Sequence, residues 1–194
     1  MNNDNDEDDP YKNNSLTANY SYEISDNNTI ENSLRVIDSF LKYDSPSNSQ
    51  DDLKPQTDDI EAHYNFKFNN INNNFKNTFG FSKSGTSREV TAASGKENDF
   101  VGSKDIYSYL GEYNFNLDNK IIYGTDVEFL RAKFDHERAG NKFKLTSGAE
   151  IYSQYIDYQF RPYENIYATI GGRNDKHTSA GDEQSYRATG SFDL

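Results

Sequence analysis

The sequence of 194 residues contains no cysteine, so neither a disulfide framework nor a cysteine-ligated metal site is possible. It contains no apolar run that approaches the roughly 20 residues of a transmembrane helix. Only 33% of the residues are hydrophobic, and the formal net charge is −12. The sequence also lacks a basic stripe, which argues against binding to nucleic acid. These absences leave either a disordered chain or a fold that needs few aliphatic residues.

The aromatic residues favour a folded chain. The sequence has 15 tyrosines and 13 phenylalanines, whereas disordered chains are poor in aromatic residues. Many aromatic and few aliphatic residues are typical of a sheet that has lipid on one face and water on the other. We therefore predict an all-β fold.

Three segments, 16–25, 60–69 and 184–194, alternate apolar or aromatic residues with polar ones at a period of two. This is the period of a β-strand, and no helix places its apolar residues in this way. The apolar positions are Leu16, Ala18, Tyr20, Tyr22 and Ile24, then Ile60, Ala62, Tyr64, Phe66 and Phe68, and finally Tyr186, Ala188, Gly190, Phe192 and Leu194.

Six further segments are compatible with strands, although their alternation is less regular; they are 30–43, 74–86, 105–117, 120–134, 147–160 and 163–177. Together the segments predict an antiparallel up-and-down meander of about nine long strands. Each segment is long enough to cross a bilayer, which takes roughly 9–11 residues, and most are longer. We therefore predict that the sheet is part of a transmembrane β-barrel.

The connections alternate between short and long. Short links rich in turn-forming residues are predicted at 26–28, 70–73, 117–119 and 161–165, and long polar loops near 44–58, 87–103, 135–145 and 177–183. Bacterial barrels have short periplasmic turns and longer extracellular loops. The predicted organisation is an acidic tail or severed loop at 1–13, followed by a barrel segment at 14–194. Met1 leads into acidic residues without a signal peptide, so we expect mature numbering or a fragment.

The order of motifs in residues 105–194 resembles that of TonB-dependent outer-membrane receptors, notably cobalamin and siderophore receptors. The segments GTDVEF (124–129) and GAEIYSQY (148–155) are followed by PYENIYATIGGRNDKH (162–177) and SYRATGSF (185–192). The resemblance implies a location in the bacterial outer membrane, in contact with its lipid. It also implies a small-molecule ligand, such as cobalamin or an iron-siderophore, for the full receptor.

The resemblance implies a complete receptor with a barrel of about 22 strands and an amino-terminal plug, on which the energy-coupling protein TonB acts. Neither a plug domain nor a coupling box can be found in this sequence, so we expect a fragment. Two alternatives stay open. One is a small outer-membrane barrel of about 8–10 strands that acts as a passive pore or structural anchor. The other is a soluble β-sandwich that acts as a binding module.

Candidate site residues are charged side chains predicted to face the lumen of the barrel. Arg173 and Asp175 share one face of their strand, and Arg187 lies on the next strand. The three residues form either a cluster that contacts plug or ligand, or an ion-pair ladder that stabilises the barrel wall. Glu128 and Glu150 are also predicted to face the lumen. No nucleophile, phosphate-binding or dinucleotide motif accompanies them, so we do not expect an enzyme.

A calcium site is a further hypothesis for the acidic loop, and cobalamin receptors similar to this sequence bind calcium in such loops. The candidate ligands are Asp44, Asp51, Asp52, Asp58 and Asp59, although they lack EF-hand spacing. The histidines His63, His136 and His177 lack the spacing of zinc ligands. Tyr22, Tyr43, Tyr107 and Tyr167 are predicted to belong to the aromatic girdles at the membrane interfaces.

Overall fold

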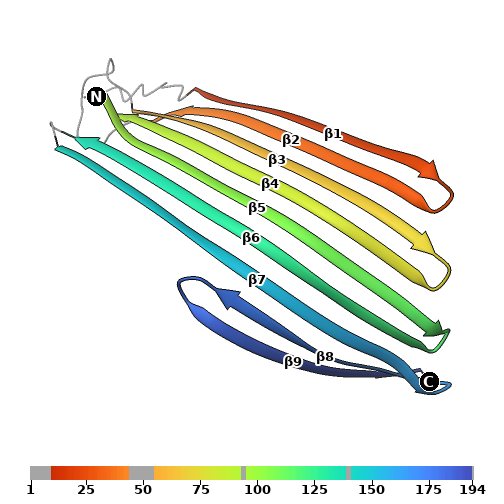
Figure 1. Ribbon diagram of the computed structural model, residues 1–194. Helices are drawn as coiled ribbons and strands as arrows, with labels where there is room; N and C mark the ends of the chain where they lie inside the picture. Colours follow the sequence, from red (N-terminus) through yellow and green to blue (C-terminus); the bar gives the residue numbers. More distant parts are fainter. Residues whose placement is uncertain (1–9, 44–54, 93–94, 139–140, 194) are drawn as a thin grey trace, which may run out of the picture.

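The computed structural model describes residues 10–43, 55–92, 95–138 and 141–193, which form a single antiparallel sheet (Figure 1). Its strands follow one another in chain order, as β1 (Tyr11–Ser25), β2 (Asn28–Lys42), β3 (Gln56–Asn72), β4 (Phe75–Ala92), β5 (Gly95–Asn116), β6 (Asn119–Arg138), β7 (Asn141–Tyr163), β8 (Ile166–His177) and β9 (Gly181–Phe192). The predicted meander of nine long strands is confirmed. In the described ranges, no helix is long and apolar enough to cross a membrane.

Four tight turns lie together at one end of the sheet, which we call the turn end (Figure 1). They connect the strand pairs at residues 26–27, 73–74, 117–118 and 164–165, as the short links in the sequence predict. Asn73 adopts a φ of 48°, a left-handed conformation that asparagine tolerates in turns. We call the opposite end, where β2 ends and β3 begins, the loop end.

Several predicted loops at the loop end are wrong. Strands β4 and β5 continue through most of 87–103, and β6 and β7 continue through most of 135–145. Only residues 178–180 separate β8 from β9, and β1 already begins within the predicted tail of 1–13. Residues 1–9 and 44–54 lie outside the described part of the chain. The polar composition of 87–92, 95–103, 135–138 and 141–145 does not end the strands, because their backbones continue the antiparallel pairing.

The register assigns every side chain to one of two faces. Directly paired residues of an antiparallel sheet project on the same side, so the chain of pairs Tyr22, Ile30, Phe68, Phe79 and Tyr109 defines one surface across five strands. We call this surface the aromatic face, and the opposite one the polar face. The alternating segments 16–25, 60–69 and 184–192 all place their apolar residues on the aromatic face, as predicted.

The apolar side chains of the aromatic face form a band that crosses the rows of paired residues obliquely. The band covers residues 16–24 on β1 and 186–192 on β9. The row of paired residues that begins at Tyr20, inside the band on β1, ends on β9 at Asp182, which lies outside the band. Rows of antiparallel pairs run perpendicular to the strands. The band is therefore level only when the strands are tilted, which is the geometry that a barrel requires.

The sheet has no apolar core of its own. Among the described residues no hydrophobic side chain is buried, and Tyr20, Phe79 and Ile156 are 59%, 48% and 55% exposed. A soluble β-sandwich would cover this face with a second sheet, but the described residues form one sheet only. The aromatic face therefore has the composition of a lipid-facing surface, and we assign the polar face to the lumen.

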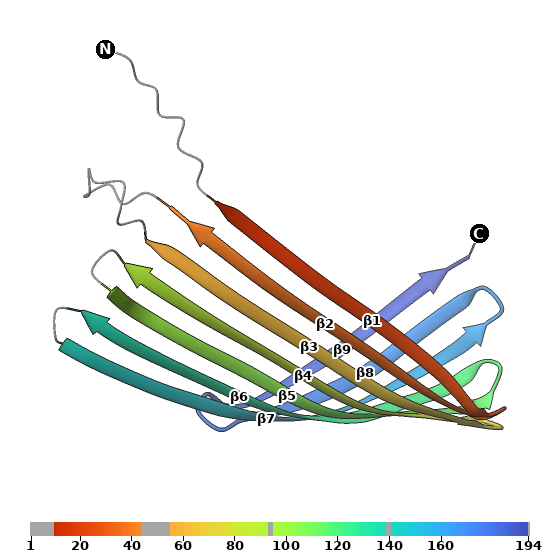
Figure 2. The same ribbon diagram turned by 90° about the horizontal axis from the view of Figure 1, so that it is seen from above.

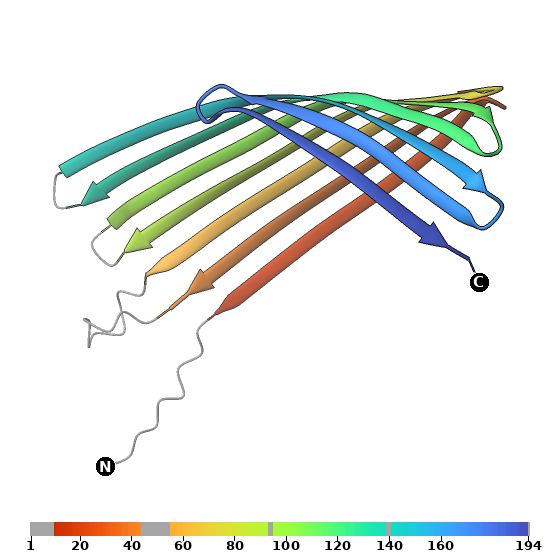
Figure 3. The ribbon, with the colours of Figure 1, turned by 90° about the horizontal axis from the view of Figure 1, so that it is seen from below.

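The two edge strands show that the sheet does not close on itself. In the described structure β1 pairs only with β2, and β9 only with β8, leaving an open, curved sheet (Figures 2 and 3). Both edge strands run from the loop end to the turn end, so joining them would create a parallel pair. Every pairing present is antiparallel. The alternative of a small closed barrel is not observed.

Candidate functional site on the polar face

Arg173 and Asp175 form an ion pair on the polar face of β8, as their spacing predicts. The Arg173 Nε donates to both carboxylate oxygens of Asp175 at 2.9 Å. The Ser153 hydroxyl of β7, which is fully buried, donates to the same carboxylate at 2.5 Å. Arg173 also lies 3.8 Å from Asp126 of β6. The cluster thus ties three strands together as an ion-pair ladder.

Arg187 belongs to a second ion pair instead of joining Arg173 and Asp175. Its Nε and Nη2 donate to the two oxygens of Asp157 at 2.9 Å and 2.5 Å, a bidentate geometry. Asp157 is 9% exposed and lies on β7, so the pair spans β8 between its partners. The sequence did not reveal Asp157, because alternation in 147–160 did not settle which residues share a face.

The Asp157–Arg187 pair is expected to stabilise the sheet by about 1 kcal/mol. Arg187 is more than half exposed, so solvent screening keeps the energy near that of a well-aligned surface pair. A double-mutant cycle with Asp157→Asn and Arg187→Gln measures this coupling as the non-additive part of the free energy of unfolding. A coupling of zero would show that the pair does not hold the strands together.

Glu128 lies on the polar face, and Glu150 does not. Glu128 pairs with Lys104 of β5 at 2.5 Å between carboxylate and ammonium. Glu150 is directly opposite Phe129 on the aromatic face, where its carboxylate accepts a hydrogen bond of 2.6 Å from the Tyr152 hydroxyl. The predicted lumen position of Glu150 is therefore wrong. It lies at the loop-end edge of the apolar band, where the outer surface becomes charged.

The histidines and aspartates form no metal site within the described residues. His63 lies 3.7 Å from Glu61, and the His136 ring forms a hydrogen bond with the Asn98 side chain. The His177 ring accepts hydrogen bonds from backbone N–H groups in the β8–β9 turn. Asp58 and Asp59 are consecutive residues of β3 and point to opposite faces, so both cannot bind one calcium ion. Asp44, Asp51 and Asp52 lie outside the described residues.

Two of the four tyrosines predicted to form the girdles project from the aromatic face. Tyr22 and Tyr107 lie on the aromatic face and are 54% and 52% exposed. Tyr167 lies on the opposite face, directly paired with Ser191, and the Arg161 guanidinium lies 5.0 Å from its ring centroid. Tyr43 follows the last residue of β2 and has no assigned face.

At the loop end of β4 to β7 the chemistry of the two faces is reversed. The polar face carries apolar side chains here, and Phe100, Phe134 and Leu145 form one row of paired residues. The aromatic face carries charges at the same level, with Lys133 next to Val101 and with Asp135 paired to Lys144. This inversion marks where the strands leave the lipid and the outer surface meets water.

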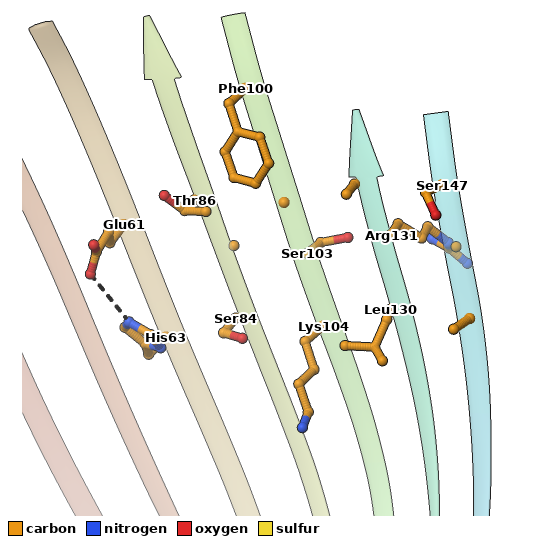
Figure 4. A pocket seen from close by; sticks show the side chains of 15 residues that line it. Glu61, His63, Ser84, Thr86, Phe100, Ser103, Lys104, Leu130, Arg131 and Ser147 are labelled. Atoms are coloured by element: carbon orange, nitrogen blue, oxygen red, sulfur yellow. Dashed lines mark ion pairs between the residues drawn. The ribbon is translucent and has the colours of Figure 1, made fainter. Parts of the chain in front are cut away.

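A hollow of about 510 Å³ lies on the polar face in this region (Figure 4). Its larger side chains come from β3, β5 and β6, and they are Glu61, His63, Phe100, Lys104, Leu130 and Arg131. Its floor consists of small residues, namely Ser84, Thr86, Gly102, Ala132, Ser147 and Ala149. The sequence does not reveal this hollow, because the polar composition of 87–103 and 135–145 predicts loops there.

The geometry defines a segment of a membrane β-barrel wall. No protein-family model matches the sequence, and no curated protein matches it significantly. The sheet is similar to part of the outer membrane transporter YddB from Escherichia coli, with a TM-score of 0.77 and 13% identity over 95% of this chain and 30% of that one. It is also similar to the siderophore receptor PirA from Pseudomonas aeruginosa, with a TM-score of 0.72 and 13% identity over 95% of this chain and 31% of that one. For the RagAB peptide importer the TM-score is 0.70 and the identity 10%, over 95% of this chain and 30% of that one.

These similarities confirm the predicted fold. The chain has the fold of part of an outer-membrane β-barrel of the kind found in TonB-dependent receptors, and it spans 30–31% of the length of those proteins. The likeness extends over 95% of the chain, beyond the residues 105–194 that carry the motifs.

Proposed function

We propose that these nine strands form part of the barrel wall of a TonB-dependent receptor that imports a scarce ligand, such as cobalamin or an iron-siderophore, across the bacterial outer membrane. The observation that carries the proposal is the oblique apolar band together with a fold shared with such transporters. The polar face lines the path of the ligand. TonB acts through the plug of the complete receptor. Calcium binds at the acidic segment through Asp44, Asp51 and Asp52, together with either Asp58 or Asp59 but not both.

The ligand class is open to direct test, because the similar structures include a siderophore receptor and a peptide importer. Deleting the complete gene from its bacterium is expected to abolish uptake of one ligand at limiting concentration. Radiolabelled cyanocobalamin, iron-loaded siderophores and peptides would be compared in the deletion strain and in a strain that lacks TonB. Uptake of every ligand unchanged in the deletion strain, or loss of uptake without dependence on TonB, contradicts the proposal.

A further inference from the structure

We infer that the hollow at the loop end of β3 to β7 binds an uncharged, apolar ring of the ligand. This inference rests on the proposed function and adds which chemical part of a ligand the barrel wall recognises. It concerns the wall itself and depends on neither the plug nor TonB.

The first support is the position of the apolar side chains. Phe100, which lines the hollow, is 38% exposed and projects from the polar face beyond the lipid band. Phe143 and Leu145, on the same end of the polar face but outside the lining of the hollow, are each 54% exposed. Neither lipid nor a second layer of the described structure covers them. An exposed apolar patch that faces water, and not lipid, often marks a ligand-binding site.

The shape of the hollow is the second support. Gly102 and Ala132 are directly paired at its floor, between the larger Phe100 and Leu130 (Figure 4). The Phe100 ring lies against Gly102, where an added Cβ would be 3.3 Å from it. The other small residues of the floor, such as Ser84, Ala132 and Ser147, leave space beside this ring that can take a flat group. The volume of about 510 Å³ lies within the range of small-molecule sites, which is roughly 300–1,000 Å³.

The charges around the hollow favour an uncharged group. Lys104 lies 2.5 Å from Glu128, and Glu61 lies 3.7 Å from His63. On the neighbouring row the Arg88 Nε donates to Asp59 at 2.6 Å, and this bond raises the pKa of the Arg88 guanidinium. Arg131 also lines the hollow, but its register, opposite Ser103, places it on the aromatic face. On the polar face Lys104 has a partner on the next strand and Glu61 has one on its own strand, so an ionic ligand group would have to displace an existing contact. A neutral ring covers Phe100 and Leu130 without that cost.

The chain has no tryptophan, so Phe100→Trp would introduce a single fluorescent reporter into the hollow. The probe is 4-bromobenzyl alcohol, a neutral ring whose bromine quenches tryptophan on contact. With the full chain refolded into lipid vesicles, quenching of this tryptophan is expected to saturate as the probe is added. Adding Ala132→Leu fills the floor of the hollow and is expected to make the quenching linear.

A single tryptophan at Phe79→Trp, on the aromatic face, is the matched control and is expected to show linear quenching. The charged analogues 4-bromobenzoate and 4-bromobenzylamine are expected to bind the hollow at least about tenfold more weakly, because each must desolvate a charge. The inference is overturned by linear quenching at residue 100, by saturation that survives Ala132→Leu, or by tighter binding of a charged analogue. None of these results bears on uptake by the complete receptor, which tests the proposed function separately.

Discussion

Phe79→Arg is expected to destabilise the membrane-inserted sheet by about 2–4 kcal/mol, the cost of an arginine near the bilayer midplane of a barrel. Phe79 lies in the middle of the apolar band on β4 and contacts rings on both sides. Its ring centroid is 6.3 Å from that of Phe68 and 4.9 Å from that of Tyr109. The guanidinium would replace a lipid-facing ring that is 48% exposed, and no carboxylate is paired with it on this row.

Two further variants separate the charge from the lost ring. Phe79→Leu keeps an apolar group and is expected to cost only the ring contacts, about 1 kcal/mol. Ser82→Arg adds the same charge on the polar face of the same strand and is expected to change stability little, since water reaches the lumen. The free energy of unfolding in guanidinium, measured in lipid vesicles, ranks the three. Equal costs for Phe79→Arg and Ser82→Arg would show that the aromatic face does not meet lipid.

The same band explains why the sequence predicted the fold well. A period of two is visible in a single strand, and residues 16–25 and 60–69 show it without interruption. Asparagine and aspartate at 26–28 and 70–73 then mark the turns. The short turns also predict the order of the strands in the sheet, because successive strands joined by short turns become antiparallel neighbours.

The loop end could not be predicted in this way, for a physical reason. Beyond the lipid the two faces exchange chemistry, so Asp99 lies outside while Phe100 lies inside. The alternation continues but its phase reverses, and the segment therefore has the composition of a polar loop. Glu150 was assigned to the wrong face at the same boundary.

The ion pairs could not be predicted either, because they depend on register. Asp157 and Arg187 are 30 residues apart and on strands that are not adjacent. Alternation fixes the face of a side chain, but not its neighbours across the sheet. The predicted cluster of Arg173, Asp175 and Arg187 is in fact two separate pairs.

A second large effect is expected at a glycine of β6. Gly124→Ala is expected to destabilise the sheet by about 2–3 kcal/mol, in the upper range for overpacked sites. A Cβ at this position would collide with the ring of Tyr155 and would lie 2.6 Å from the Tyr109 carbonyl oxygen. The ring also carries the Arg173 guanidinium 5.6 Å from its centroid, so moving it disturbs the Arg173–Asp175 pair.

Gly85→Ala is the matched control on β4, since the nearest atom to its added Cβ is a carbonyl oxygen at an ordinary 3.7 Å. Alanine there is expected to stabilise the sheet by about 0.5–1 kcal/mol, because it restricts the unfolded chain more than glycine does. The two substitutions add the same methyl group and should therefore change the free energy of unfolding in opposite directions. Adding Tyr155→Ala to Gly124→Ala should recover only part of the loss, because the Tyr109 carbonyl stays in place. Full recovery would show that the ring alone, and not the close approach of β5, requires glycine at residue 124.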